Sequence, residues 1–253
     1  MIPPTSIDGT DITGATIDGT DVQEITVDGD VVFSAVSADV TLPSNTVLRY
    51  AANTQNYNNN DTVTTFVDSV GNFDATASGN PQFLTNQVNG LPAVSYDGSN
   101  DYHDTGHVNS SSGQATYYFV LDFVGSTTNK VFYGAEISGG SNAAWIGTFP
   151  GVYRTRFGNI SSSQSSGSTL SGFHLITVEI DNGSFNLITN SSTNQLSYSF
   201  NQAGSLGFND FIGGLNVSGS LKVPQELNIA EIIYAESLRN TQTEQDLIAK
   251  YNL

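Results

Sequence analysis

A ten-residue phrase is repeated three times within the first 34 residues of this chain. The copies begin at Ile7, Ile17 and Val27, and each places an Asp-Gly pair between β-branched residues. Asp-Gly readily supplies the positive φ angles of a tight turn, and β-branched residues favour extended backbone, so we expect three small hairpins or corners. A two-stranded ribbon cannot bury a core by itself. The repeats therefore need a partner surface, either on other chains or on the remainder of this chain.

The order of segments predicts one large β domain with a small N-terminal appendage. Residues 1–34 form an anchoring and oligomerisation segment made of β-hairpin repeats, and residues 35–45, which contain Pro43, form a linker. From residue 46 to residue 253, short β-type runs alternate with Gly, Asn, Asp and Ser. Many short strands separated by turn signals predict an antiparallel sandwich.

The clearest hairpin consists of residues 173–180 and 184–188, joined at Asn182-Gly183. Asn-Gly favours the two-residue turns that fit the twist of paired strands. Alternate apolar residues of the first run fall on one face, which we expect to face the core.

One convincing helix is predicted, at residues 240–251. Asn240 or Thr241 can cap it, and Glu244 follows Thr241 at the spacing of a capping box.

Charge restricts the partners of the chain. Seven Lys and Arg residues stand against 24 Asp and Glu residues, which gives a formal net charge of −17, although only 12% of the residues are charged. An acidic surface poor in basic residues is typical of proteins from concentrated brine, where salt screens self-repulsion. A secreted acidic adhesin is the alternative. Binding to phosphates depends on Lys and Arg, so nucleic acid is excluded as a partner, and no apolar run predicts membrane insertion.

Residues 88–102 read Val-Asn-Gly-Leu-Pro-Ala-Val-Ser-Tyr-Asp-Gly-Ser-Asn-Asp-Tyr, and further characteristic phrases occur at residues 65–76 and 229–235. Over residues 46–253 these phrases resemble the concanavalin A-like lectin/glucanase superfamily, in its laminin-G-like form. The resemblance implies an all-β, antiparallel jelly-roll sandwich with a short C-terminal helix. It also implies that the concave face or the rim loops contact carbohydrate.

The repeats between Ile17 and Phe33 are similar to segments in structural proteins of tailed viruses that infect haloarchaea. This resemblance implies a virion surface protein in a high-salt environment, such as a tail fibre, spike or capsid turret, with a lectin-like head that recognises a host surface glycan or glycoprotein. We expect residues 1–34 to contact other virion proteins and further copies of the chain. The simplest assembly is a trimer, and a five-fold or six-fold ring is the alternative. A purely structural capsid or tail decoration protein and a divergent polysaccharide hydrolase stay open as other functions.

The glucanase branch of this superfamily carries three carboxylates on one strand, in the order Glu, one residue, Asp, two residues, Glu. The nearest match here is Glu179 and Asp181, followed by Ser184 in place of the second Glu. Retaining hydrolysis then lacks its proton donor, so we expect no enzymatic activity.

Carbohydrate binding needs an aromatic platform beside amide and carboxylate groups. Trp145 is the only tryptophan, and two of the few arginines follow it closely. The predicted carbohydrate-binding residues are Trp145, Tyr153, Arg154, Arg156, Tyr102 and His103. The alternative is that Trp145 belongs to the core and the arginines form surface ion pairs.

No cofactor is required by this interpretation, but Asp-rich turns could hold Ca²⁺ or Mg²⁺ through carboxylate and carbonyl oxygens. The candidate ligands are Asp68, Asn72 and Asp74 in one turn, and Asp97 and Asp101 in another. Asp and Asn also occupy turns because they hydrogen-bond to their own backbone. The same choice, between weak metal ligation and ordinary loop polarity, applies to the cluster of Asp101, His103, Asp104 and His107.

Overall fold

A computed structural model of the chain describes residues 40–253 apart from 111–112, 126–129, 137–142, 159–163, 167–168 and 202–204, together with short strands between residues 16 and 34. The chain divides into two compact units, Met1–Val40 and Thr41–Leu253. Among the described residues, no helix has the length and apolar character needed to cross a membrane.

The described part of the first unit consists of two antiparallel hairpins. Their strands are β1 (Thr16–Ile17) with β2 (Thr20–Asp21), and β3 (Glu24–Val27) with β4 (Asp30–Ser34). In each hairpin the two strands lie on either side of one Asp-Gly pair in the sequence, as the turn chemistry of the second and third repeats predicts. The first repeat lies outside the described residues.

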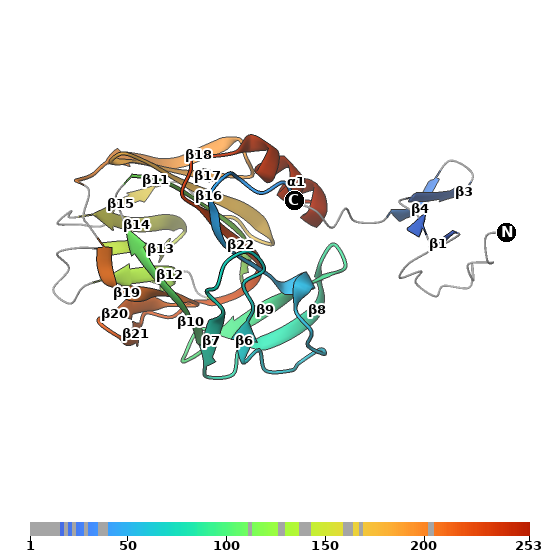
Figure 1. The fold of residues 1–253 in the computed structure, drawn as a ribbon, viewed down its shortest axis with the longest axis horizontal. Coiled ribbons are helices and arrows are strands. Elements are labelled where there is room, and N and C mark those ends of the chain that lie inside the picture. The colour runs from blue at the N-terminus through green and yellow to red at the C-terminus, as the bar shows by residue number, and fades with distance from the viewer. Residues whose placement is uncertain are drawn as a thin grey trace. The chain divides into compact units, whose positions relative to one another are not determined.

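The second unit is a sandwich of two sheets, and Figure 1 shows β16–β18 of one sheet in a layer above β12–β14 of the other. The ten-stranded sheet, here called the front sheet, has the order β15-β14-β13-β12-β19-β10-β7-β6, and β20 and β21 attach beside β12. Its strands are β6 (Thr65–Phe66), β7 (Ala75–Ser78), β10 (Tyr102–Ser110), β12 (Lys130–Glu136), β13 (Ala143–Phe149), β14 (Val152–Gly158), β15 (Gln164–Ser166), β19 (Ser205–Ile212), β20 (Leu215–Val217) and β21 (Ser220–Lys222).

The eight-stranded sheet, here called the back sheet, has the order β18-β17-β16-β11-β22-β9-β8, and β5 attaches beside β22. Its strands are β5 (Thr46–Ala51), β8 (Gln82–Val88), β9 (Leu91–Asp97), β11 (Gln114–Phe123), β16 (His174–Asp181), β17 (Ser184–Thr189), β18 (Thr193–Ser199) and β22 (Glu226–Ala235). A 3₁₀ turn, η1 (Ala52–Thr54), follows β5, and α1 (Thr241–Tyr251) ends the fold. The predicted all-β sandwich with a C-terminal helix is confirmed.

The predicted hairpin at Asn182-Gly183 is also confirmed, because β16 and β17 pair across it. Asn182 and Gly183 have φ angles of 46° and 94°, the left-handed geometry that this turn requires. Ile176, Val178 and Ile180 point into the core between the sheets.

Residues 41–45 were predicted as part of the linker, but they pack with the second unit. The backbone N–H of Thr41 donates to Asp246 on α1 at 2.8 Å, and Pro43 is buried. The division between the units therefore falls at Val40, inside the predicted linker.

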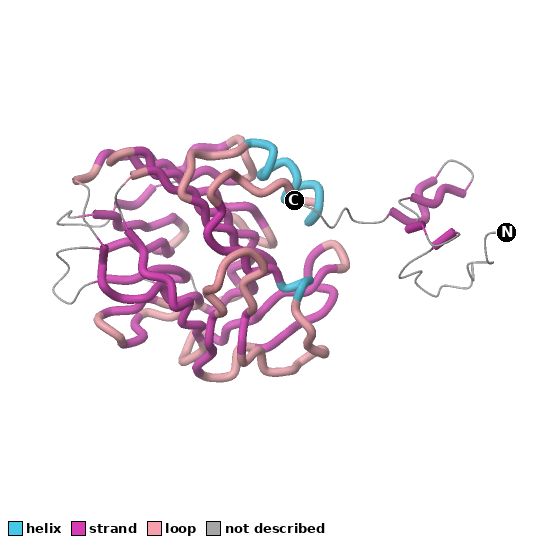
Figure 2. The backbone as a smooth tube through the Cα atoms, in the orientation of Figure 1, coloured by secondary structure: helices cyan, strands magenta, loops and turns pink. Residues whose placement is uncertain are grey.

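The helix α1 lies against the outer side of the back sheet (Figure 2). Asn240 caps it, because its side-chain oxygen accepts the N–H groups of Gln242 and Thr243 at 2.9 and 3.5 Å. The predicted capping box with Glu244 does not form. Glu244 is fully buried and accepts hydrogen bonds from Thr177 of β16 and from Arg239 instead.

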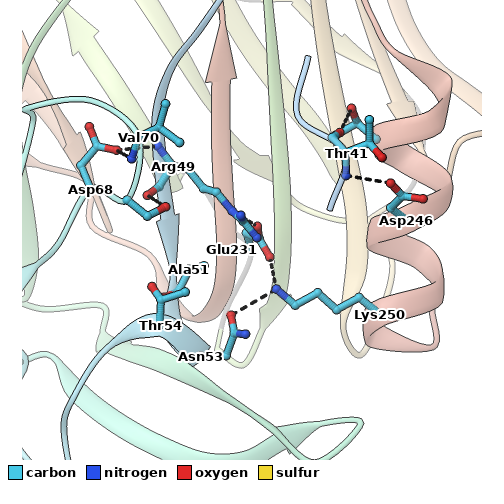
Figure 3. A network of polar contacts seen from close by, with 12 residues as sticks. Thr41, Arg49, Ala51, Asn53, Thr54, Asp68, Val70, Glu231, Asp246 and Lys250 are labelled. Atoms are coloured by element: carbon cyan, nitrogen blue, oxygen red, sulfur yellow. Dashed lines mark hydrogen bonds and ion pairs between the residues drawn. The ribbon is translucent and has the colours of Figure 1, made fainter. Parts of the chain in front are cut away.

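A buried carboxylate fixes the other end of α1 (Figure 3). Glu231 of β22 is 1% exposed and accepts Arg49 Nε at 2.6 Å, Lys250 Nζ at 2.7 Å and Tyr251 Oη at 2.8 Å. These contacts join β5, β22 and α1 on the outer side of the back sheet. The front sheet has no helix over its outer face in the part of the chain that the structure describes.

Candidate functional site

A groove of about 380 Å³ lies on the outer face of the front sheet, across β7, β10 and β19. Its principal lining residues are Asp74, Thr76, Ser78, Tyr102, Asp104, Gly106 and Asn209. We call it the Tyr102 groove. It combines an aromatic ring with carboxylate, amide and hydroxyl groups, which is the combination that carbohydrate binding requires.

Strand β10 builds the floor of the groove through strict alternation. Tyr102, Asp104 and Gly106 line the groove, whereas His103 and His107 between them are buried. Successive side chains of a strand point to opposite faces, so this polar strand serves both the groove and the interior.

A β-bulge shapes the groove beside Asp104. The pairing of β10 with β19 shifts register between Asp104 and Val108, and Gly106 within this stretch has a φ of 66°. Asp104 Oδ1 accepts the N–H of Gly106 at 3.0 Å, which orients the carboxylate at the bulge. Bulges of this kind redirect a side chain at the edge of a binding site.

Tyr102 is held by stacking on Phe211, with ring centroids 4.3 Å apart and an interplanar angle of 23°. Phe211 is only 3% exposed, so it holds the Tyr102 ring in place where that ring lines the groove. The hydroxyl residues come from β7, where Ser78 pairs with Tyr102 and Thr76 pairs with Asp104. The pairing register of β7 with β10 therefore sets the positions of the Ser78 and Thr76 hydroxyls relative to Tyr102 and Asp104.

Trp145 lies on the outer face of the same sheet, but it is only 7% exposed. Hydrophobic residues of β12, β13 and β20 cover it, namely Val131, Ala143, Leu215 and Val217. Its Nε1 donates to Glu136 Oε2 at 2.7 Å, and Arg156 donates to the other oxygen of Glu136 at 3.2 Å. The structure therefore places Trp145 in a second apolar cluster, as the alternative interpretation expected, and not on an open platform.

The remaining members of the predicted site are divided between the two faces of the front sheet. Arg154 is on the outer face, with its guanidinium 5.2 Å from the centroid of the Phe149 ring. Tyr153 is fully buried, and its hydroxyl oxygen lies 3.2 Å from His174 Nε2. Burial raises the pKa of Tyr153. Tyr153 is therefore a core residue. Strands β12 and β19 lie between β13 and β10, the strand that carries Tyr102, so the structure does not bring Tyr102 together with Trp145 or with the residues of β14.

His103 was predicted to contact carbohydrate, but it is fully buried. Its Nδ1 lies 2.9 Å from Tyr96 Oη, and its Nε2 lies 2.9 Å from the carbonyl of Val63. A neutral ring with the proton on Nε2 satisfies both contacts, because it accepts from the tyrosine and donates to the carbonyl. Burial lowers the pKa of His103 to about 4, against the opposing effect of the Val63 hydrogen bond.

We expect acid to destabilise the sandwich through His103. The unfolded chain binds this proton below its ordinary pKa of about 6.5, whereas the folded chain binds it only below about 4. Stability contributed by the neutral ring is therefore lost as the pH falls through this window, by about 3 kcal/mol. Urea unfolding of the parent and of His103→Gln at pH 7 and pH 4.5, in the same molar salt, measures the difference.

The comparison between parent and variant isolates His103 from the other buried groups. Burial also lowers the pKa of His174, which acts with the same sign, and raises the pKa of Asp210, which acts with the opposite sign. Equal losses of stability in both proteins between the two pH values would show that His103 does not titrate in this way.

The Asp-rich turns use their carboxylates to bind backbone. Asp68 accepts the N–H groups of Arg49 and Val70 at 2.9 and 3.0 Å through Oδ1, and that of Phe73 through Oδ2. N–H donors point positive charge at an oxygen, so these positions suit turn formation better than a cation.

The second predicted metal turn has the same character. Asp101 accepts the N–H groups of Asn80 and Asp97, and Asp97 accepts those of Ser99 and Asn100. Asn72 and Asp74 are exposed, and Asp74 Oδ1 accepts the N–H of Asp68 at 2.9 Å. In the described ranges no three His, Asp or Glu side chains come together in a group that could hold a metal ion.

Solved structures of low sequence identity share this fold. A mutant of Trypanosoma rangeli sialidase displaying trans-sialidase activity aligns with a TM-score of 0.58 and 11% identity, over 83% of this chain and 33% of that chain. Domain 4 of AbnA, a GH43 extracellular arabinanase from Geobacillus stearothermophilus, in complex with arabinotriose, aligns with a TM-score of 0.55 and 17% identity, over 80% and 99%.

Botulinum neurotoxin type C, whose cell entry depends on interaction with two ganglioside molecules, aligns with a TM-score of 0.53 and 13% identity, over 81% of this chain and 50% of that chain. This chain spans about a third of the length of the sialidase. No protein-family model and no curated protein matches the sequence. The chain thus shares a β-sandwich fold with domains of these three proteins.

Proposed function

We propose that the sandwich is a non-enzymatic carbohydrate-binding module that recognises a host surface glycan or glycoprotein, and that the whole chain is a surface structural protein of a virion in a high-salt environment. The observation that carries the glycan-binding part is the Tyr102 groove. Its volume of about 380 Å³ is within the usual range of small-ligand sites. Its lining places one fixed aromatic ring among groups that exchange hydrogen bonds with hydroxyls.

Each component of the groove has a role in sugar recognition. The ring of Tyr102 offers an apolar surface for the C–H side of a sugar ring. Asp104 and Asn209 supply acceptors and donors for hydroxyl groups, and the hydroxyls of Thr76 and Ser78 can act as either. The similar fold of an arabinanase domain solved with arabinotriose agrees with this assignment.

A hydrolase is the alternative that one observation favours, because Asp74 and Asp104 both line the groove. One oxygen of each already accepts a backbone N–H, so both carboxylates take part in shaping the turns that surround the groove.

The carboxylates of the glucanase-like motif lie elsewhere, on β16 of the back sheet. There Glu179 accepts the N–H of Arg239, and Asp181 accepts Gln114 Nε2. These positions support a binding function.

Two sequence features support the virion part of the proposal. The N-terminal repeats are similar to segments of structural proteins from tailed viruses of haloarchaea, and the net charge of −17 fits a saline medium. In an assembly, several weak sugar sites act together and gain avidity. A purely structural decoration protein is the remaining alternative, and it requires no glycan binding at all.

Replacing Tyr102 by alanine is expected to weaken binding to host-envelope polysaccharide about 10- to 100-fold, by analogy with the ~1–3 kcal/mol of a base stacked on an aromatic side chain. Phe149→Ala is the matched control, because Phe149 is an aromatic residue of β13, 40% exposed and outside the groove. A glycan array and titrations in molar salt measure binding, and release of reducing sugar is assayed in parallel. Equal binding by the two variants would show that the Tyr102 groove is not the binding site. Release of reducing sugar would support the hydrolase as the function. A parent protein that binds no glycan would support the decoration protein.

Removing residues 1–40 is expected to leave a folded, monomeric sandwich, because these residues form a separate compact unit. The full chain should sediment as an oligomer, since the repeats need a partner surface for their β-branched residues. Sedimentation of both forms at micromolar concentration measures this difference. A monomeric full chain, or a truncated chain that does not fold, would show that the repeats do not serve as an oligomerisation segment.

A further inference from the structure

A second groove, of about 450 Å³, lies beside the C-terminal end of α1, on the outer side of the back sheet. The residues that matter for its chemistry are Gln87, Asn89, Asp122, Phe173, Asn228 and Tyr251. We call it the Asn228 groove. It is formed by the opposite sheet from the Tyr102 groove and shares no residue with it.

The floor of the Asn228 groove is a directly opposed pair of polar residues. Asp122 of β11 and Asn228 of β22 are partners in the antiparallel ladder. Their neighbours Leu121 and Leu227 point into the main core, so alternation directs Asp122 and Asn228 together to the outer side. Directly opposed side chains of a sheet have Cβ atoms about 5 Å apart, a spacing at which both can contact one small ligand.

Asn228 carries an unsatisfied acceptor. The residue is 8% exposed, and its Oδ1 is buried without a hydrogen-bond partner in the described structure. A buried carbonyl oxygen without a donor is destabilising, and it calls for a specific explanation in a native fold. A ligand hydroxyl in the groove provides one when the amide of Asn228 turns Oδ1 from its buried position toward the groove.

The walls of the groove limit what that ligand can be. Phe173 supplies an apolar edge, and Tyr251 contributes its ring while its hydroxyl donates to Glu231. Gln87 and Asn89 add amides at the β8–β9 turn, where Asn89 Nδ2 donates to the carbonyl of Lys250 at 2.9 Å. Among the described residues, no Lys or Arg side chain lines the groove, so an anionic ligand is disfavoured. A neutral ligand with adjacent hydroxyl donors and an apolar face fits this lining.

We infer that the Asn228 groove is a second, independent binding site for a neutral sugar unit, in which Asp122 and Asn228 accept hydrogen bonds from adjacent hydroxyls. Two sites on opposite sheets would let one sandwich bind two glycan strands at once. This goes beyond the proposed function, because a module with one site can attach to a surface but cannot bridge two strands.

The experiment titrates the ¹⁵N-labelled full chain in molar salt with the methyl glycosides of glucose, galactose, mannose and N-acetylglucosamine, and follows the amide signals by NMR. We expect one of them to cause saturable shifts in the backbone and side-chain amides of Asn228 and in the backbone amide of Asp122. The variant Asn228→Leu, which keeps the size of the side chain, should weaken this binding at least about 10-fold, a loss typical of a hydrogen bond to a charged or buried group.

Two controls separate this site from the Tyr102 groove and from misfolding. Tyr102→Ala should leave the shifts at Asn228 unchanged, and Asn228→Leu should melt at or above the temperature of the parent, because it removes a buried unpaired acceptor. The inference is overturned if none of the four glycosides shifts these amides, if the shifts persist in Asn228→Leu, or if Tyr102→Ala abolishes them. Any of these results leaves the Tyr102 groove to be judged by its own titration.

Discussion

Replacing Glu231 by alanine is expected to lower the free energy of unfolding by about 3–5 kcal/mol, the usual cost of removing one partner from a buried ion pair. Glu231 is the shared anion of Arg49 and Lys250, whose side chains are 13% and 1% exposed. Without the carboxylate, two cations face each other at a site that water scarcely reaches, and Tyr251 loses its acceptor. Urea unfolding in molar salt measures the loss.

Glu236→Ala is the matched control for this substitution. Glu236 follows the last residue of β22 and is exposed, so its removal should change stability by no more than about 0.5 kcal/mol. A loss in Glu231→Ala as small as that of the control would mean that desolvation cancels the ion pairs and that α1 is held by apolar contacts alone.

The same network explains why the arginines misled the sequence interpretation. In a chain with few basic residues, Arg154 and Arg156 stood out as candidates for ligand binding. Four of the seven Lys and Arg residues form ion pairs with acidic partners in the described part of the fold, namely Arg49, Arg156, Arg239 and Lys250. Scarcity of basic residues therefore reflects structural use at least as much as ligand recognition.

Most of the fold was predictable because its long strands are apolar on at least one face. Strands β11, β16 and β22 bury nearly every residue and stand out in the sequence. Strand β10 is hard to recognise in the sequence because it is polar on both faces: Asp104 lines the groove, and His103, Thr105 and His107 are buried. The strand that carries the candidate site thus gives only a weak sequence signal.

The alternation of side chains along a strand could have shown which of the predicted residues near Tyr102 share its face. Tyr102 and His103 are consecutive, so in a strand only one of them can face a ligand, whereas Tyr102, Asp104 and Gly106 share a face. Thr76 and Asn209 could not have been found in this way, because they reach the groove through the pairing of distant strands. Long-range register is not written in local sequence patterns.

Trp145 shows the same limit most clearly, since the residues that cover it come from a strand added in parallel. Strand β20 pairs in parallel with β12 and brings Leu215 and Val217 over the indole. No local pattern around Trp145 indicates this cover.

Replacing Trp145 by alanine is accordingly expected to cost about 3–5 kcal/mol of stability, as for other buried tryptophans. The variant loses its apolar contacts and also the hydrogen bond that orients Glu136 toward Arg156. Binding at the Tyr102 groove should be unchanged in the folded fraction, because β12 lies between β13, which carries Trp145, and β19, the nearest strand of the groove. Cooperative unfolding in urea and titration with host-envelope polysaccharide, both in molar salt, measure the two quantities.

Trp145→Phe separates the two contributions, because it keeps an aromatic ring in the cluster and removes only the Nε1 donor. It should recover more than half of the loss, since apolar burial is the larger part of the cost of removing a buried aromatic side chain. An alanine variant that unfolds like the parent but no longer binds polysaccharide would contradict this assignment. The β20–β21 hairpin would then have to move away from the indole in solution, and Trp145 would be a sugar platform after all.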